Sequence, residues 1–351
     1  MLNISKKIRL IFGVLLIALV LPQTALADGT GNANFSVKAE LPENQVDKDQ
    51  TYFDLRMKPG EKQAISLVLD NPSDEPVSVT VQPNVATTNQ NGEMDFSGSN
   101  TDIDNSLTHV FTDLISKEQT VELAANETKK VTFDLTMPAE EFQGIVLGGF
   151  YIYKNVSEEE EKASENVQIK NRYSYVIGVQ LSMNDEEVTP EVVLNEIKPD
   201  LLNYRTIVTA NLQNTMPTMI GKFKVDAKVY NKAGTELLHE TIKEAMTMAP
   251  NSNFGFPISW DNQRLEPGTY LLKLQASSGD NKWDFDQEFT ISATDSKKLN
   301  EEAVELEEAG INWYLIIGSG AVILAVIIGG IFVYQSKKDK KRASKKRTNK
   351  K

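Results

Sequence analysis

Apolar and polar residues alternate with a period of two through much of the chain, which is the pattern of half-buried β-strands. Apolar side chains recur at every second position in 65–69 and again in 77–81, with the turn-like segment 71–76 between them. The same pattern appears in 121–123 and 131–135, on either side of Asn126-Glu127. Each pair predicts two strands joined by a short connection, with the apolar side chains facing a core.

The run from Gly144 to Tyr153 (GIVLGGFYIY) is more continuously apolar than these strands. It predicts a central strand or one that a partner covers. Two adjacent glycines inside a strand cost stability unless backbone or a ligand must come close, and a β-bulge at a sandwich corner is the alternative explanation. The candidate partner-binding residues are therefore Gly144, Leu147, Gly148, Gly149 and Tyr151.

The alternating pattern breaks at 184–187 and then restarts, which places a domain boundary there. Further strands are expected at 205–213, 223–229 and 254–260. The segment Leu265–Tyr270, a Pro-Gly turn followed by Tyr, resembles the tyrosine corner of immunoglobulin-like sandwiches. Short strands with such turns predict an all-β fold of two tandem immunoglobulin-like β-sandwich domains.

Two aromatic residues of the second half, Trp260 and Trp283, invite a carbohydrate-binding interpretation, because sugars stack on exposed rings. Both fall in phase with inward-facing rows, so core packing is the expectation for them. The facing of Tyr151 and Tyr153 is left open by their sequence context.

An apolar run lies near each end of the chain. Lys6, Lys7 and Arg9 precede the run 10–21, and the layout predicts a signal peptide cleaved after Ala27. The second run, 313–334, carries no charged residue and is followed by a tail rich in Lys and Arg. A helix of that length measures about 33 Å and spans a hydrocarbon core of roughly 30 Å. By the positive-inside rule the tail stays in the cytoplasm.

These patterns divide the chain into six parts. They are a signal peptide (1–27), a first β-sandwich (28–187), a second β-sandwich (188–293), an acidic stalk (294–312), a single transmembrane helix (313–334) and a basic cytoplasmic tail (335–351). The stalk is expected to form a short acidic helix. The resulting localisation is the cell membrane, crossed once, with the two sandwiches outside the cell and facing the wall.

Composition adds the compartment and the charge. The chain has no cysteine, so an exported domain must be held by its packed core rather than by disulfides, as is common in Gram-positive bacteria. The formal net charge is −12, but thirteen basic residues and one acidic residue lie in the predicted signal and tail, which leaves the ectodomain near −24. Such a surface should not bind nucleic acid by charge.

Catalytic motifs are not found, and the chain is predicted not to be an enzyme. His109 and His239 lack partners at metal-ligand spacing and are expected at the surface or in loops. The sequence has no thiol, G-x-S-x-G elbow or phosphate-binding glycine loop in the ectodomain. The carboxylate pairs Asp102/Asp104 and Asp284/Asp286 are spaced to share one face of a strand, which is usually a solvated face.

A cofactor is not expected either, with one alternative left open. Asn89, Asn91, Glu93 and Asp95 supply closely spaced oxygens in a predicted loop, so calcium is a possible ligand. The run lacks the spacing and the terminal Glu of an EF-hand.

Several segments in order along the chain resemble the WxL-interacting protein family of Gram-positive bacteria. In the first half these are Leu41-Pro42-Glu43-Asn44-Gln45, Tyr52–Leu55, Pro59-Gly60 and Gln143–Gly149; in the second they are Met248–Ser252, Phe254–Pro257 and Leu265–Tyr270. The resemblance implies an N-terminal peptidoglycan-binding domain and a C-terminal host-protein-binding domain. It also implies association with WxL-domain surface proteins of the same cell.

These observations favour a non-enzymatic cell-surface scaffold that binds peptidoglycan, a WxL-domain protein and, in addition, a host extracellular protein. Strand addition at an exposed sandwich edge would be its natural binding mode, since main-chain hydrogen bonds supply affinity without a pocket. Two alternatives stay open: a host-matrix adhesin whose first domain is a spacer, and a membrane-tethered assembly chaperone. Deletion of 188–293 separates the first alternative from a scaffold, because only an adhesin would lose its main activity.

Overall fold

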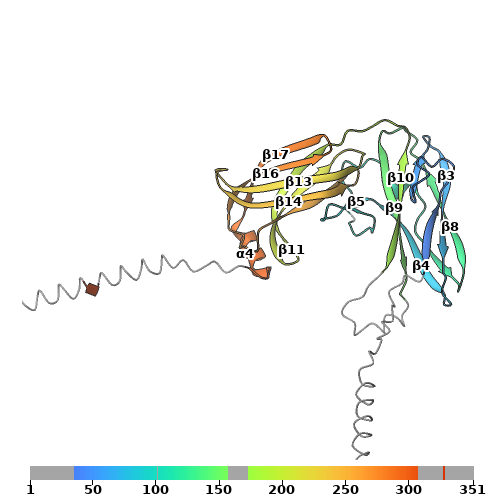
Figure 1. The fold of residues 1–351 in the computed structure, drawn as a ribbon, viewed down its shortest axis with the longest axis horizontal. Coiled ribbons are helices and arrows are strands. Elements are labelled where there is room, and N and C mark those ends of the chain that lie inside the picture. The colour runs from blue at the N-terminus through green and yellow to red at the C-terminus, as the bar shows by residue number, and fades with distance from the viewer. Residues whose placement is uncertain (1–34, 101, 157–172, 307–326, 329–351) are drawn as a thin grey trace, which may run out of the picture. The chain divides into compact units, whose positions relative to one another are not determined.

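Strands dominate the computed structural model, which describes residues 35–100, 102–156, 173–306 and 327–328 (Figure 1). The predicted all-β class is confirmed. The predicted signal peptide and basic tail lie outside the described residues, as does the predicted transmembrane helix apart from Ile327 and Ile328. Within the described part of the chain, no helix is long and apolar enough to cross a membrane.

The first half of the described chain forms two sheets. One has the strand order β1-β3-β8 and the other the order β2-β10-β9-β4-β7. Their strands are β1 (Ser36–Glu40), β2 (Phe53–Arg56), β3 (Lys62–Asp70), β4 (Val77–Val85), β7 (Gln119–Leu123), β8 (Thr128–Thr136), β9 (Ile145–Lys154) and β10 (Ser174–Ser182). A small hairpin of β5 (Thr87–Thr88) and β6 (Met94–Asp95) and the short helix α2 (Phe111–Leu114) lie between β4 and β7 in the chain.

One hydrophobic core joins the buried faces of these two sheets, so they form a sandwich. The core cluster takes Leu67 from β3 and Phe133 from β8, and Val81, Phe150 and residues of β10 from the other sheet. The rings of Phe133 and Phe150 lie 4.6 Å apart, centroid to centroid, across the layers. Burying each such side chain contributes roughly 1.5–3 kcal/mol, which makes this core the main source of stability in a chain without disulfides.

Both predicted short connections are present, but neither closes a hairpin. Each links a strand of one sheet to a strand of the other. β3 and β4 are both strands with buried alternating residues, as expected, yet β3 pairs with β8 and β4 pairs with β7 and β9. The two connections are hydrogen-bonded to each other. Asn71 N–H donates to Glu127 O at 2.9 Å, and Asn126 N–H donates to Ser73 O at 3.0 Å. Asn126 has φ +57°, a conformation that Asn tolerates better than most residues.

The second half of the chain forms two further sheets, of orders β11-β12-β15 and β14-β13-β16-β17. Their strands are β11 (Val192–Leu202), β12 (Arg205–Asn214), β13 (Ile220–Asn231), β14 (Leu237–Met248), β15 (Ser252–Ser259), β16 (Gly268–Ser278) and β17 (Asn281–Ile291). Trp260 is buried and Trp283 packs edge-on against the buried Phe223 ring, so both tryptophans pack as predicted. Tyr270 stacks on Phe289 with ring centroids 5.5 Å apart.

The described chain groups into two compact units. The larger contains the residues up to 198 together with 209–258 and 270–289, and the smaller contains 199–208, 259–269 and the residues from 290 onward. The smaller unit is built around helix α4 (Ala293–Glu302), whose first turn is capped by the Ser292 hydroxyl accepting from Asp295 N–H.

Two polar residues of α4, Ser296 and Asn300, are buried within the smaller unit. Asn300 accepts from Leu265 N–H at 2.9 Å and donates to Leu265 O at 3.0 Å, and the Ser296 hydroxyl donates to the same carbonyl. A helix of the predicted stalk is therefore present, but its described part is packed against the 259–269 loop.

Candidate functional site

The outer face of the five-stranded sheet carries two partly exposed aromatic rings. Alternation along β9 places Val146, Phe150 and Ile152 in the core, and Tyr151 and Tyr153 on the opposite face. The two tyrosine rings lie 5.5 Å apart. The sequence left their facing open, and the sheet register settles it.

Neighbouring strands extend this face on both sides of β9. Tyr151 lies directly across from Gln82 of β4 and from Val176 of β10, whose side chain is 45% exposed. We call Gln82, Tyr151, Tyr153 and Val176 the tyrosine face. A pyranose ring can stack its C–H groups on tyrosine rings, since an aromatic face carries partial negative charge.

Fixed polar groups border the tyrosine face along β4. Thr80 lies across from Tyr153 but is buried, and its hydroxyl lies 2.9 Å from the hydroxyl of the exposed Thr120. The Asn155 amide donates to Thr80 Oγ1 at 3.0 Å and to Ser78 Oγ at 3.2 Å. Aromatic rings beside oriented hydroxyl and amide groups are the arrangement by which proteins recognise polar ring-shaped ligands.

The two strand glycines have a packing explanation. A Cβ at Gly148 would lie 2.0 Å from Cδ1 of the buried Phe111, and a Cβ at Gly149 would lie 2.8 Å from Cδ1 of Phe96 and 3.0 Å from Ile177 O. The β9 register with β10 continues through both residues without a shift, so the bulge interpretation is wrong. Phe111 of α2 enters the core through the space that Gly148 leaves.

Gly144 and Leu147, the other early members of the candidate set, also pack within the larger unit. Gly144 has φ +77°, a Cβ there would lie 2.3 Å from Pro217 O, and Ile145 N–H donates to that carbonyl at 2.8 Å. Leu147 is buried with Ala86 and Ala249. Of the five candidate residues, Tyr151 is therefore the one that presents a large, partly exposed side chain.

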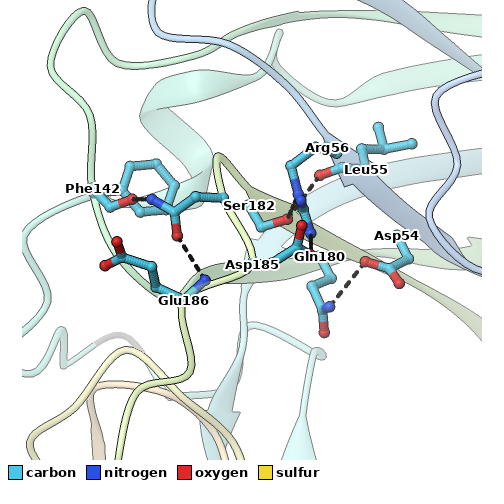
Figure 2. A network of polar contacts seen from close by, with 9 residues as sticks. Asp54, Leu55, Arg56, Phe142, Gln180, Ser182, Asp185 and Glu186 are labelled. Carbon is cyan, nitrogen blue, oxygen red and sulfur yellow. Dashed lines mark hydrogen bonds and ion pairs between the residues drawn. The ribbon is translucent and has the colours of Figure 1, made fainter.

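A polar network lies at the β2 edge of the same sheet (Figure 2). Gln180 Nε2 donates to Asp54 Oδ1 at 2.9 Å, while Arg56 donates to Ser182 Oγ at 3.0 Å and to Asp185 Oδ1 at 2.5 Å. Burial raises the pKa of Asp54, against the lowering effects of the Gln180 hydrogen bond and the Arg56 charge. The Arg56 guanidinium holds the pKa of Asp185 below its usual range.

The network continues into the segment that follows β10. Asn184 donates to Phe142 O at 3.4 Å and accepts from Glu186 N–H at 3.2 Å. Gln143 donates to the Glu186 carboxylate. A pocket of about 370 Å³ borders this network. These bonds attach the chain that leaves the first sandwich to the 141–143 loop, which is a structural role that nothing in the sequence pattern indicated.

The loop that contains Asp102 and Asp104 does not follow the prediction. Neither residue lies on a strand, and Asp104 is buried. Within the larger unit, Asp104 accepts hydrogen bonds from Asn253 Nδ2 at 2.5 Å, from Gln213 Nε2 at 2.7 Å and from the Ser106 backbone and hydroxyl. Burial opposes ionisation of Asp104, but these hydrogen bonds outweigh it and lower its pKa.

Asp104 also lines a pocket of about 280 Å³, which the same loop shares with the end of β4 and residues 251–253. Its lining is rich in amides and hydroxyls, including Asn84, Asn100 and Ser252.

The oxygens proposed for calcium take part in local turns. Asn89 Oδ1 accepts from the backbone N–H groups of Asn91 and Glu93, and the Asp95 carboxylate accepts from Ser97 and Ser99. In the described residues no three His, Asp or Glu side chains converge as metal ligands.

The two histidines differ from each other. His239 is buried on β14, so its predicted surface or loop position is wrong. His109 lies in a loop, as predicted, with its ring 5.1 Å from the Phe142 ring.

Asp284 and Asp286 share the exposed face of β17, as predicted, where Asp284 accepts from Gln275 and Asp286 pairs with Lys273.

Two family models match this chain in tandem. The model described as "WxL Interacting Protein, peptidoglycan binding domain" matches residues 35–154, and the one described as "WxL Interacting Protein, host binding domain" matches 164–301. The chain belongs to the WxL-interacting protein family, as the sequence resemblance implied.

Other comparisons are more distant, and no curated protein matches the chain. Similar solved structures include the PapD-like domain 7 of human CEP192, at 12% identity over 44% of this chain and 88% of that one, with a TM-score of 0.26. The class 5 fimbriae chaperone CfaA matches at 13% identity over 73% and 98%, with a TM-score of 0.24. The Pseudomonas aeruginosa CupB2 chaperone matches at 10% over 64% and 91%, also at 0.24. Likenesses this loose indicate no function for this chain.

Proposed function

We propose that this chain is a non-enzymatic scaffold of the Gram-positive cell surface. Its first domain, 28–187, binds peptidoglycan through the tyrosine face. Its second domain, 188–293, binds a protein, either a WxL-domain surface protein of the same cell or a host protein. The domains are taken as tandem immunoglobulin-like sandwiches, exported by the signal peptide, held by the 313–334 helix and followed by a cytoplasmic tail. No cofactor is required.

The tyrosine face carries the peptidoglycan part of this proposal. Gln82, Tyr151 and Tyr153 lie in the segment that the peptidoglycan-binding model matches, whereas Val176 lies in the segment that the host-binding model matches. The face combines two rings with hydroxyl and amide groups held by hydrogen bonds. Gln82, Tyr151, Tyr153 and Val176 are uncharged. Recognition by stacking and hydrogen bonding would also avoid the repulsion between a strongly acidic ectodomain and the anionic polymers of a wall.

Co-sedimentation of the purified protein with Gram-positive sacculi tests the proposal, and the variant is Tyr151→Ala with Tyr153→Ala. If each ring contributes roughly 0.5–1.5 kcal/mol, the pair together should weaken binding roughly tenfold. Tyr204→Ala is the matched control, because Tyr204 is 66% exposed and lies on the turn between β11 and β12.

Salt and chelator sharpen the same assay. Binding through the tyrosine face should persist at high salt and in the presence of a calcium chelator, since neither an ion pair nor a metal is part of it. Equal binding by the double variant and the wild type would contradict the proposal. Loss of binding on chelation would favour the calcium alternative at 89–95.

Deletion of 188–293 separates the proposal from the adhesin alternative. A scaffold without this domain still sediments with sacculi, whereas an adhesin with a spacer domain loses host binding and shows no wall binding of its own.

A further inference from the structure

The pocket of about 280 Å³ that Asp104 lines lies next to the tyrosine face, within the larger unit. Gln82 belongs to both, because it lines the pocket and lies directly across from Tyr151. Neighbouring strands are about 4.8 Å apart, a spacing close to the length of one pyranose unit. A sugar chain stacked on Tyr151 would therefore place its next unit at this pocket.

The walls of the pocket are held in place without a ligand. Asn84 Nδ2 donates to Phe96 O at 2.9 Å, and a Cβ at Gly98 would lie 2.9 Å from the same amide group. Gly98 also has φ +73°, so the loop reaches β4 at this point only with glycine. Asp104 fixes the rest of the loop by accepting from Asn253. Sites for small ligands are usually formed in advance in this way.

The charges of the lining exclude an anionic ligand and favour a neutral one. None of the described residues that line the pocket is basic, so an anion would find no counter-charge there. The Asp104 carboxylate is buried and already accepts from Ser106, Gln213 and Asn253. Asp102, the second acidic residue, is exposed to water, which weakens its attraction for a cation.

The remaining lining combines amide groups with aliphatic side chains. Asn100 Oδ1 accepts from Asp102 N–H at 3.1 Å, while Asn100 Nδ2 donates to no described residue. The Gln82 side chain makes no hydrogen bond within the described part of the chain. Ile103, which is 56% exposed, and Leu107 supply apolar surface. An acetamido group needs these three things: a donor for its C=O, an acceptor for its N–H and an apolar contact for its methyl group.

We propose that this pocket binds the acetamido group of an N-acetylated sugar, next to the sugar that stacks on the tyrosine face. The inference rests on the proposed function and names the feature by which the chain distinguishes peptidoglycan from unacetylated polysaccharides. Asn100 Nδ2 donates to the acetamido carbonyl, the Gln82 amide oxygen accepts from its N–H, and Ile103 contacts its methyl group. A sugar without the acetamido group leaves these polar groups unpaired, so the site discriminates against it.

Calorimetric titration of the purified full chain with three soluble tetrasaccharides tests the inference. Chitotetraose carries an acetamido group on every ring, cellotetraose has a hydroxyl at the same positions, and the tetramer of glucosamine has an amine there. Chitotetraose should bind about tenfold more tightly than either of the others, because only it satisfies both the donor and the acceptor.

A pair of matched variants places the preference in the pocket. Asn100→Asp keeps the oxygen that accepts from Asp102 N–H but replaces Nδ2 with a second oxygen. It should weaken chitotetraose binding about tenfold and leave cellotetraose binding unchanged. Asn105→Asp makes the same change in the same loop, outside the pocket lining, and keeps the oxygen that accepts from Gln213. It should change neither affinity.

The outcomes distinguish this inference from the proposed function. A chitotetraose preference that Asn100→Asp removes and Asn105→Asp keeps supports the inference. Equal affinities for chitotetraose and cellotetraose, or no binding of chitotetraose, overturn it. Tighter binding of the glucosamine tetramer, or an equal loss in both variants, shows that charge decides and also overturns it. Sedimentation of the Tyr151→Ala, Tyr153→Ala protein with sacculi reports on the proposed function separately, since stacking does not depend on the acetamido group.

Discussion

The outer faces of the two larger sheets are built on the same alternation but present different chemistry. On the five-stranded sheet, the tyrosine face is uncharged and its two rings are partly exposed. On the four-stranded sheet, opposite charges pair both within a strand and between neighbouring strands. Lys228 Nζ lies 2.9 Å from Asp226 and 3.1 Å from Glu240, and Lys273 Nζ lies 3.6 Å from Asp286.

This difference separates the proposed binding surface from a solvated one. A charged side chain that already has an ion-pair partner in the sheet contributes little to ligand binding, since exchanging that partner for a ligand in water gains little free energy. Exposed rings remain available, because water does not satisfy them in the same way. The proposed peptidoglycan contact is therefore placed on the face of the first sheet and not on the face of the second.

The largest loss of stability is expected from a substitution in β9, on the core side of the strand that carries Tyr151 and Tyr153. Gly148→Ala brings a Cβ to 2.0 Å from the Phe111 ring, which is buried in the core, so the unfolding free energy should fall by about 1–3 kcal/mol or more. Gly178→Ala is the control on neighbouring β10, where the nearest atom to a Cβ is Tyr52 Cβ at 3.7 Å. Urea unfolding measures both, and equal losses would contradict the assigned role of Phe111.

Substitution of Asp104 should cause the next largest loss of stability. Asp104→Asn replaces a carboxylate that accepts from Asn253 and Gln213, and should cost about 1–3 kcal/mol at neutral pH. Its folded-state pKa is lowered from 3.8, so its contribution is present above that pH and is lost as the pH falls through the folded-state value. Urea unfolding across acidic pH should therefore show wild type and variant converging, and parallel curves would contradict this.

Asp54, a buried residue of edge strand β2 in the same sheet, should show the opposite pH dependence of stability. Its folded-state pKa is raised from 3.8, chiefly by burial, so ionisation destabilises the fold as the pH rises past 3.8. Asp54→Asn should therefore change stability less than Asp104→Asn at neutral pH and should remove this loss. The same urea series measures it, and a loss at neutral pH as large as that of Asp104→Asn would show that the Gln180 hydrogen bond dominates instead.

The smallest loss of stability is expected on the outer face of the four-stranded sheet, where the charges pair with one another. Lys273→Gln removes the pair with Asp286 and the contact of Nζ with the Tyr230 ring, 5.9 Å from its centroid. Exposed pairs of this kind contribute about 1 kcal/mol or less, and salt screens them. The variant should differ from wild type by less at high salt than at low salt, as measured by urea unfolding. A larger, salt-independent loss would contradict the description of this face as solvated.

Strand positions and inward rows were predictable because alternation is a local property. Ile65, Val79 and Phe256 are buried where the period of two placed them, and the central position of β9 followed from its continuous apolar run. The family resemblance was equally accessible, since its motifs are short segments in order along the chain.

The candidate site was predictable only in part. Tyr151 was named, but its partners Gln82 and Val176 come from strands far apart in sequence, and only the register joins them. The Arg56–Asp185 pair and the burial of Asp104 likewise depend on contacts between distant residues, for which a single sequence carries no signal.

By itself, then, the sequence determined where strands form, which side chains they bury and how the chain turns at 71–76 and 124–127. The tertiary structure decided that these turns cross between sheets, that Phe111 fills the space at Gly148 and that β14 lies at an edge. The physical reason is that a strand with one apolar row gains free energy by burying that row, whichever apolar surface covers it. The choice of neighbour depends on how volumes and hydrogen-bonding groups from distant segments fit together.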